Sequence, residues 1–211
     1  MPTLHLRPIV IAIAFAGLLP ASHATVLVEN LSQPTRGTTA LSNSVWATQS
    51  FSTAATPVLL NNIEVNVGLA VDPSVVAELR ADNGAGAPGV LLTTFSLSGL
   101  TDGATQTEML TPDTGDVPLA ANLGYWLVLG VRGFGTFGFS YAEGNVKTGP
   151  GSLGNYAYSE NSGTSWSGFN SDNPYHLRVN VTAVPEPTSA LLLLVGSCGV
   201  MLAVRRRTRR C

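Results

Sequence analysis

The chain has 211 residues, enough for one domain or two small ones, and this length excludes a large multidomain enzyme. Charged residues make up only 11% of it, and five of its eleven basic residues lie in the last seven positions. The stretch from Thr25 to Val184 therefore holds five basic and twelve acidic residues, a net charge of −7. Because a protein that binds nucleic acid needs a basic face to neutralise phosphates, this composition argues against that class of partner.

The first 24 residues have the pattern of a secretory signal peptide. Met1–Pro8 carries one arginine and no acid, and Ile9–Leu19 is an uninterrupted apolar run. That run is about half the roughly 20 residues needed to cross a bilayer. The small residues of Ser22-His23-Ala24 suit a signal peptidase, so we expect cleavage between Ala24 and Thr25 and export of the rest of the chain.

The body, residues 25–183, is predicted to consist of short β-strands. Ile63–Val71 alternates apolar and polar residues, which places every odd-numbered side chain, Val71 included, on the buried face. Tyr125–Val131 is apolar on both faces and is expected to be a central strand covered on each side, whereas Tyr175–Thr182 alternates again. The other strand candidates are Val26–Leu31, Val45–Phe51, Val75–Ala81, Leu91–Leu97, Thr107–Leu110, Phe137–Tyr141 and Tyr156–Ser159.

Turn-forming clusters such as Asp82-Asn83-Gly84 and Gly149-Pro150-Gly151 separate these runs. About ten short strands with almost no helical periodicity predict an all-β, antiparallel, jelly-roll-like β-sandwich. Pro73–Arg80 is the one stretch of the body that would also suit a helix.

The order of features in the body resembles a known family. A strand ends in Asp82-Asn83-Gly84, a turn follows at Pro88-Gly89, the next strand runs through Leu91–Phe95, and Leu119–Leu127 reads LAANLGYWL. In this order the chain resembles the exported bacterial domains called choice-of-anchor, most closely the R type, which join one body to different C-terminal anchors. The resemblance implies a surface role and no particular reaction.

Motifs of catalysis are incomplete in this sequence. His176 is the only histidine left after export, and the alternation of its strand places it on the outward, solvated face. Asp113-Thr114-Gly115 matches the aspartic-protease triplet but occurs once, and Gly149–Gly154 has the glycine spacing of a dinucleotide loop without the strand and helix around it. We therefore predict no catalytic residues, no cofactor and no metal site, although paired carboxylates of a glycosidase or a structural calcium ion near Asp113–Asp116 stay open.

Two aromatic residues of the body indicate binding. Trp166 and Phe169 lie in the polar segment Ser162–Asn173, where a large ring has few apolar partners nearby in the sequence. Exposed rings stack on sugars, so these residues are candidates for contact with a glycan. The alternative is that Trp166 folds back as a lid on the end of the sandwich, while Trp46 and Trp126 are expected in the core.

The last 28 residues have a layout of their own. Val184-Pro185-Glu186-Pro187 is expected to be extended, because two prolines exclude a regular helix or a paired strand. Thr188–Val204 then runs for 17 residues without a charge, and a basic cluster follows from Arg205. As a helix this run would span roughly 26 Å, enough for one short transmembrane helix. The arginines would stay in the cytoplasm and the body outside it.

This tail resembles the sorting signal of PEP-CTERM proteins, which combines Pro185, Glu186 and Pro187 with a hydrophobic helix, Ala190–Val204, and the basic residues Arg205, Arg206 and Arg207. The resemblance implies cleavage by an exosortase in a Gram-negative bacterium that makes exopolysaccharide. We therefore expect an inner-membrane precursor with its body in the periplasm, and then a non-enzymatic protein of the cell surface or extracellular matrix. The alternative function is a carbohydrate-binding module that docks exopolysaccharide.

Overall fold

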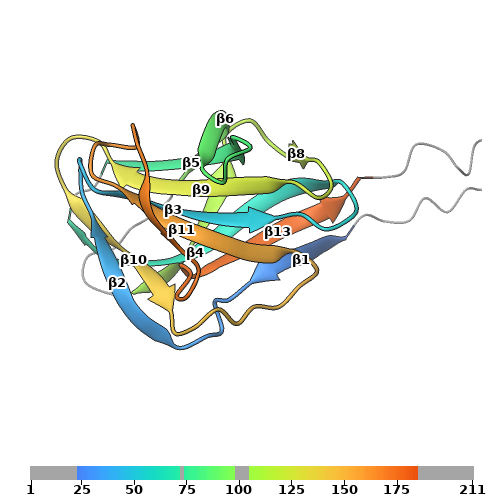
Figure 1. Cartoon of the computed structure of the whole chain (residues 1–211), viewed down its shortest axis with the longest axis horizontal. Coiled ribbons are helices and arrows are strands. Elements are labelled where there is room, and N and C mark those ends of the chain that lie inside the picture. Colours follow the sequence, from blue (N-terminus) through green and yellow to red (C-terminus); the bar gives the residue numbers. More distant parts are fainter. Residues whose placement is uncertain (1–22, 72–73, 98–104, 185–211) are drawn as a thin grey trace, which may run out of the picture.

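The structure, a computed structural model, describes residues 23–71, 74–97 and 105–184, without the side chains of residues 69 and 70. In these ranges the chain is all-β and forms thirteen strands (Figure 1). Every strand pairing is antiparallel. Most of the predicted signal peptide and nearly all of the predicted sorting tail lie outside the described residues.

The strands form two layers, which we call sheet A and sheet B. Sheet A contains β1 (Ala24–Glu29), β13 (Leu177–Ala183), β4 (Val58–Val71), β7 (Gln106–Pro112), β8 (Val117–Leu119), β10 (Thr136–Ala142) and β2 (Thr35–Leu41). Sheet B runs in the order β6 (Pro88–Ser96), β5 (Val75–Asp82), β9 (Gly124–Val131), β3 (Trp46–Ser52), β11 (Ser152–Ser159) and β12 (Ser167–Asn170). A short pairing of β6 with β7 joins the sheets at one edge.

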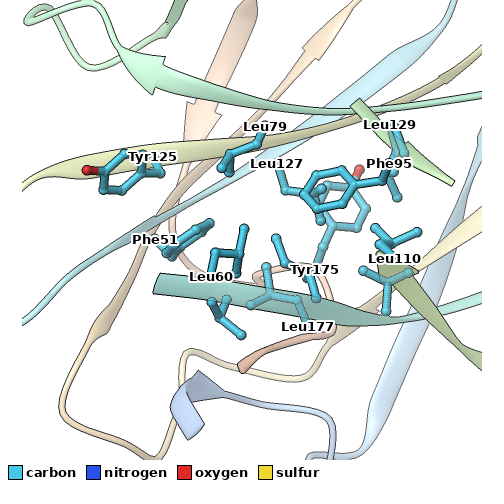
Figure 2. Close-up of a cluster of buried hydrophobic side chains, with 14 of the residues drawn as sticks. Phe51, Leu60, Leu79, Phe95, Leu110, Tyr125, Leu127, Leu129, Tyr175 and Leu177 are labelled. Carbon is cyan, nitrogen blue, oxygen red and sulfur yellow. The ribbon is translucent and has the colours of Figure 1, made fainter. Parts of the chain in front are cut away.

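The core lies between the two sheets, where the alternating strands bury their apolar faces. Ile63, Val65 and Val67 of β4 are fully buried, as their spacing predicts. Figure 2 shows side chains of both sheets in this cluster, among them Leu177 of β13 and Leu127 of β9. Residues on both faces of β9 are buried, which confirms it as a strand covered on each side.

The expected alternation fails at the far end of β4. Val71 is 61% exposed, although its odd-numbered position predicts an inward side chain. The pairing of β4 with β10 shifts register between Thr136, which pairs with Val71, and Gly138, which pairs with Gly68. A shift of this kind bends the strand and breaks the period of two.

The alternative of a helix over Pro73–Arg80 is wrong for the described part of that stretch, because Val75–Asp82 is strand β5, paired with β9 along Val75–Ala81. Three further strands, β2, β8 and β12, have no counterpart among the predicted ones. β8 has only three residues, and β2 and β12 are rich in threonine, serine and glycine, so none shows an apolar alternation. Their pairing with β10, β4 and β11 makes them strands.

The two ends of the body lie next to each other. β1 pairs with β13 so that Ala24 faces Thr182, and both strands reach the same side of the molecule in Figure 1. Within the described ranges, no helix is long and apolar enough to cross a membrane. The predicted transmembrane segment, Ala190–Val204, lies outside those ranges.

Candidate binding face of sheet B

The outward face of sheet B carries large apolar side chains in a second cluster, separate from the core between the sheets. Trp46, Val76 and Val128 form this cluster, and Trp166 packs against it. An antiparallel sheet commonly leaves one face to water, so buried tryptophan on this side needs a cover. We call the surface formed by Trp46, Trp126, Trp166 and Phe169 the aromatic face.

The indole of Trp46 is held between two glycines. A Cβ atom at Gly130 of β9 would lie 2.4 Å from this indole, and one at Gly163 would lie 2.7 Å from it. The ring therefore rests on the backbone of the sheet and is covered by the backbone of the segment Ser162–Asn173. Its Nε1 donates to the carbonyl of Val131 at 3.3 Å.

The segment Ser162–Asn173, here called the lid, is anchored by hydrogen bonds at its start. Ser162 donates from its amide to the carbonyl of Ser44 and from its hydroxyl to the carbonyl of Asn43, at 3.1 and 2.6 Å. The Ser159 hydroxyl accepts the amide of Gly163 at 2.8 Å. Trp166 folds back, as the alternative predicts, and its ring is partly buried, but it packs on the outward face of sheet B and not on the end of the sandwich.

The other end of the aromatic face is built around Trp126. Its Nε1 donates to the Asp82 carboxylate at 2.8 Å, and that carboxylate also accepts the amide of Gly84 at 2.7 Å. Phe169 meets Trp126 edge-on, with ring centroids 5.9 Å apart, and stays 41% exposed. Trp46 and Trp126 are buried as expected, but on the outward face of sheet B and outside the main core cluster.

Two hollows open beside these rings. The larger, about 370 Å³, is lined by Asn43, Trp46, Val131, Arg132, Gly133 and Ser162. The smaller, about 220 Å³, lies beside Trp126, with Ser50, Asp82 and Asn155 in its wall. Only the larger reaches the 300–1,000 Å³ typical of small-molecule sites.

A charged group crosses the same face. The carboxylate of Glu78 is 5% exposed and accepts two hydrogen bonds from Arg80 on one oxygen, at 2.9 and 2.7 Å. Arg132 is 72% exposed and approaches the other oxygen only to 3.9 Å. These three side chains carry a net charge of +1, in a body whose charge is strongly negative.

His176 is not the solvated residue that the strand pattern predicts. Its side chain is fully buried, with Nδ1 3.0 Å from the Asn30 carbonyl and Nε2 3.1 Å from the Thr35 hydroxyl. The chain that connects β1 and β2 covers the outward side here, which the alternation of one strand does not reveal. A carbonyl only accepts, so Nδ1 carries the proton and Nε2 accepts from Thr35 in the neutral ring. Burial lowers the pKa of His176 below its usual value.

The remaining predicted site residues fall in two groups. Ala24 and Thr25 are exposed in β1, whereas Pro185, Glu186, Pro187, Arg205, Arg206 and Arg207 lie outside the described residues. In the oxygen-rich loop, Asp113 accepts hydroxyl hydrogen bonds from Ser96 and from Thr94, which lower its pKa. Across the described ranges, no cluster of three or more His, Cys, Asp or Glu side chains is placed to hold a metal ion.

Sequence reasoning identified the two rings of the lid but missed Arg132 and Asn43, which lie in turns, and Asp82, where β5 ends and a turn begins. Their contribution becomes visible only when sheet B brings these turns to its outward face. A scan against models of protein families finds no match for this chain, and a search of curated proteins finds none either.

Proposed function

We propose that this chain is an exported, non-enzymatic protein of the cell surface or extracellular matrix, sorted by an exosortase. Signal peptidase would release residues 1–24, and the exosortase would read Pro185, Glu186, Pro187, the apolar segment and the arginines. One observation supports this proposal: the core cluster of the described residues begins at Leu27 and ends at Val181, and the two end strands of the body, β1 and β13, pair with each other. In this proposal the body is a jelly roll similar to the choice-of-anchor domains.

Removal of residues 1–24 and of the sorting tail should lower the stability of the body only slightly. Ala24, Thr25 and Ala183 are exposed, and the first and last buried apolar side chains of the described ranges, Leu27 and Val181, lie between them. Since little apolar surface is buried at these ends, cleavage there leaves the hydrophobic stabilisation of the sandwich in place. Such a body suits delivery by segments that are later discarded.

Glu186 and the arginine cluster test the sorting step. In the producing bacterium, Glu186→Gln or deletion of residues 205–210 should leave a full-size precursor in the inner membrane, measured by immunoblotting of cell fractions. Glu160→Gln, which changes an exposed acid of the body, is the matched control and should mature like the wild type. Normal maturation of both tail variants would disprove the proposal.

The aromatic face supports a second candidate function, the binding of a glycan. Phe169 presents an exposed ring beside Trp126, and the adjoining hollow is lined by hydroxyl and amide groups of Ser50 and Asn155. Sugars offer an apolar C–H face and hydroxyl groups, which match a ring and polar side chains placed together. The observation that favours this candidate is the exposure of Phe169 on a face where the tryptophans are covered.

Affinity electrophoresis in the exopolysaccharide of the producing cells tests this candidate. We expect the full chain, purified in detergent, to be retarded, and Phe169→Ala to lose most of the retardation. Met109→Ala removes a similarly exposed apolar side chain from sheet A and should not change it. Equal retardation of the wild type and Phe169→Ala would exclude a role for this ring.

A further inference from the structure

We propose that the larger hollow, at the Trp46 end of the aromatic face, binds the carboxylate of a uronic-acid residue in an acidic polysaccharide. This inference rests on the glycan-binding function proposed above and adds the class of sugar. It depends on the charge, the polar groups and the size of the hollow.

Arg132 supplies the charge. Arg132 lines the hollow and its side chain is 72% exposed, so a ligand reaches it from solvent. Arg132 forms only a long ion pair with the Glu78 carboxylate, at 3.9 Å and beyond hydrogen-bond distance, whereas Arg80 makes both hydrogen bonds to that carboxylate. Arg132 therefore keeps its planar fork of donors for a second carboxylate.

The other walls suit the rest of a sugar. The Ser162 hydroxyl donates to the carbonyl of Asn43, which leaves its oxygen free to accept from a sugar hydroxyl, and the Asn43 side chain is exposed beside it. Trp46 and Val131 also line the hollow, but they are only 5% and 0% exposed, so they shape its wall and the polar groups make the contacts. At about 370 Å³ the hollow falls within the range of small-molecule sites.

The smaller hollow indicates the direction in which the polysaccharide would lie along the aromatic face. It carries the carboxylate of Asp82 near Trp126, where a uronate would meet a like charge. A neutral sugar suits that end, beside Phe169. The aromatic face therefore distinguishes an acidic residue at the Arg132 end from a neutral one at the Phe169 end.

The test compares polygalacturonate with its fully methyl-esterified form, which has the same backbone without the negative charge. Binding of the detergent-purified full chain to each polymer, immobilised on beads, gives two affinities. We expect tighter binding to polygalacturonate, and a loss of about tenfold in Arg132→Gln, the effect of removing a hydrogen-bonded charged group. Arg132→Lys keeps the positive charge but lacks the planar fork of donors. Its affinity for polygalacturonate should lie between those of the wild type and of Arg132→Gln.

Arg36→Gln is the matched control, because Arg36 is an exposed arginine on β2 of sheet A, and it should bind like the wild type. Unchanged thermal unfolding of Arg132→Gln confirms that the fold is intact. Equal affinities for the two polymers, or an Arg132→Gln variant that binds polygalacturonate like the wild type, would overturn the inference. If the methyl ester is still bound and Phe169→Ala abolishes that binding, the glycan-binding function is supported and only the uronate site at Arg132 is rejected. Binding to neither polymer also overturns the inference, and retardation in the exopolysaccharide then decides the broader function separately.

Discussion

The outward faces of the two sheets differ in the side chains that they carry and in how those side chains are covered. On sheet A, Arg178 of β13 pairs with Glu64 of β4 at 3.0 Å, and Asn180 donates to Asn62 at 2.6 Å. On sheet B, the equivalent positions hold Trp46 and Trp126, which are buried. Arg178 and Glu64 of the first face are partly exposed to water, whereas the lid covers the Trp46 ring of the second.

This difference shows that the aromatic face is not required by the sandwich. Sheet A demonstrates that polar side chains are enough on an outward face, as is usual for antiparallel sheets. Covering tryptophan instead requires an ordered segment, and ordering backbone costs about 1–2 kcal/mol per residue. The lid is therefore the counterpart of the tryptophans beneath it, and stability measurements can test how far the two faces differ.

The largest expected effect comes from Trp46. Trp46→Ala should lower the free energy of unfolding by about 3–5 kcal/mol, because it empties a buried site between two glycine backbones. Urea denaturation of the full chain in detergent, followed by fluorescence of the remaining tryptophans, measures the change.

Phe134→Ala is the control for this prediction, since Phe134 is 96% exposed, and surface changes of this kind stay within about 0.5 kcal/mol. A loss below about 1 kcal/mol in Trp46→Ala would mean that the lid does not cover the ring in solution. The aromatic face would then resemble the solvated face of sheet A, and the comparison would fail.

Much of the sandwich was predictable because a period of two has a direct physical meaning. Where a strand is half-buried, as at Ile63–Val67 and in β13, apolar residues mark the inner face. The alternation of apolar residues does not predict β2, because the residues of this strand are mostly small and polar. β2 becomes a strand through its pairing with β10. The alternation was wrong at His176, because the covering residues come from the connection between β1 and β2.

The candidate site was predictable only in part, for a related reason. Trp166 and Phe169 stand out as rings in a polar segment. Arg132 is an ordinary arginine after a strand, and nothing in the sequence places it beside residues 43 and 162. A site assembled from three distant turns becomes visible only with the register of sheet B.

His176 should have a smaller effect on stability, seen as a dependence on pH. It tests the comparison of the two faces because it is a polar side chain that is buried on the side of sheet A. Its pKa is lowered in the folded protein, so the unfolded chain binds more protons as the pH falls through the usual histidine range near 6.5. Stability should therefore be complete above that range and decrease below it. In His176→Gln the pH dependence between about pH 7.5 and 5.5 should flatten, measured by thermal unfolding across that range. An unchanged slope would assign the dependence to other groups.

The smallest expected effect is at Glu64 on the solvated face. Glu64→Gln removes the ion pair with Arg178 but keeps a side chain of the same shape that still accepts from Asn180. Because Arg178 is 34% exposed and water replaces the lost interaction, the free energy of unfolding should fall by less than about 1 kcal/mol. Glu78→Gln is the matched change on sheet B, where the carboxylate is 5% exposed and binds Arg80, and it should cost clearly more. Urea denaturation of the two variants side by side would show whether the deeper burial of the carboxylate on sheet B separates the two faces. Equal losses would place both carboxylates in the same solvent environment and remove the distinction between the two sheets.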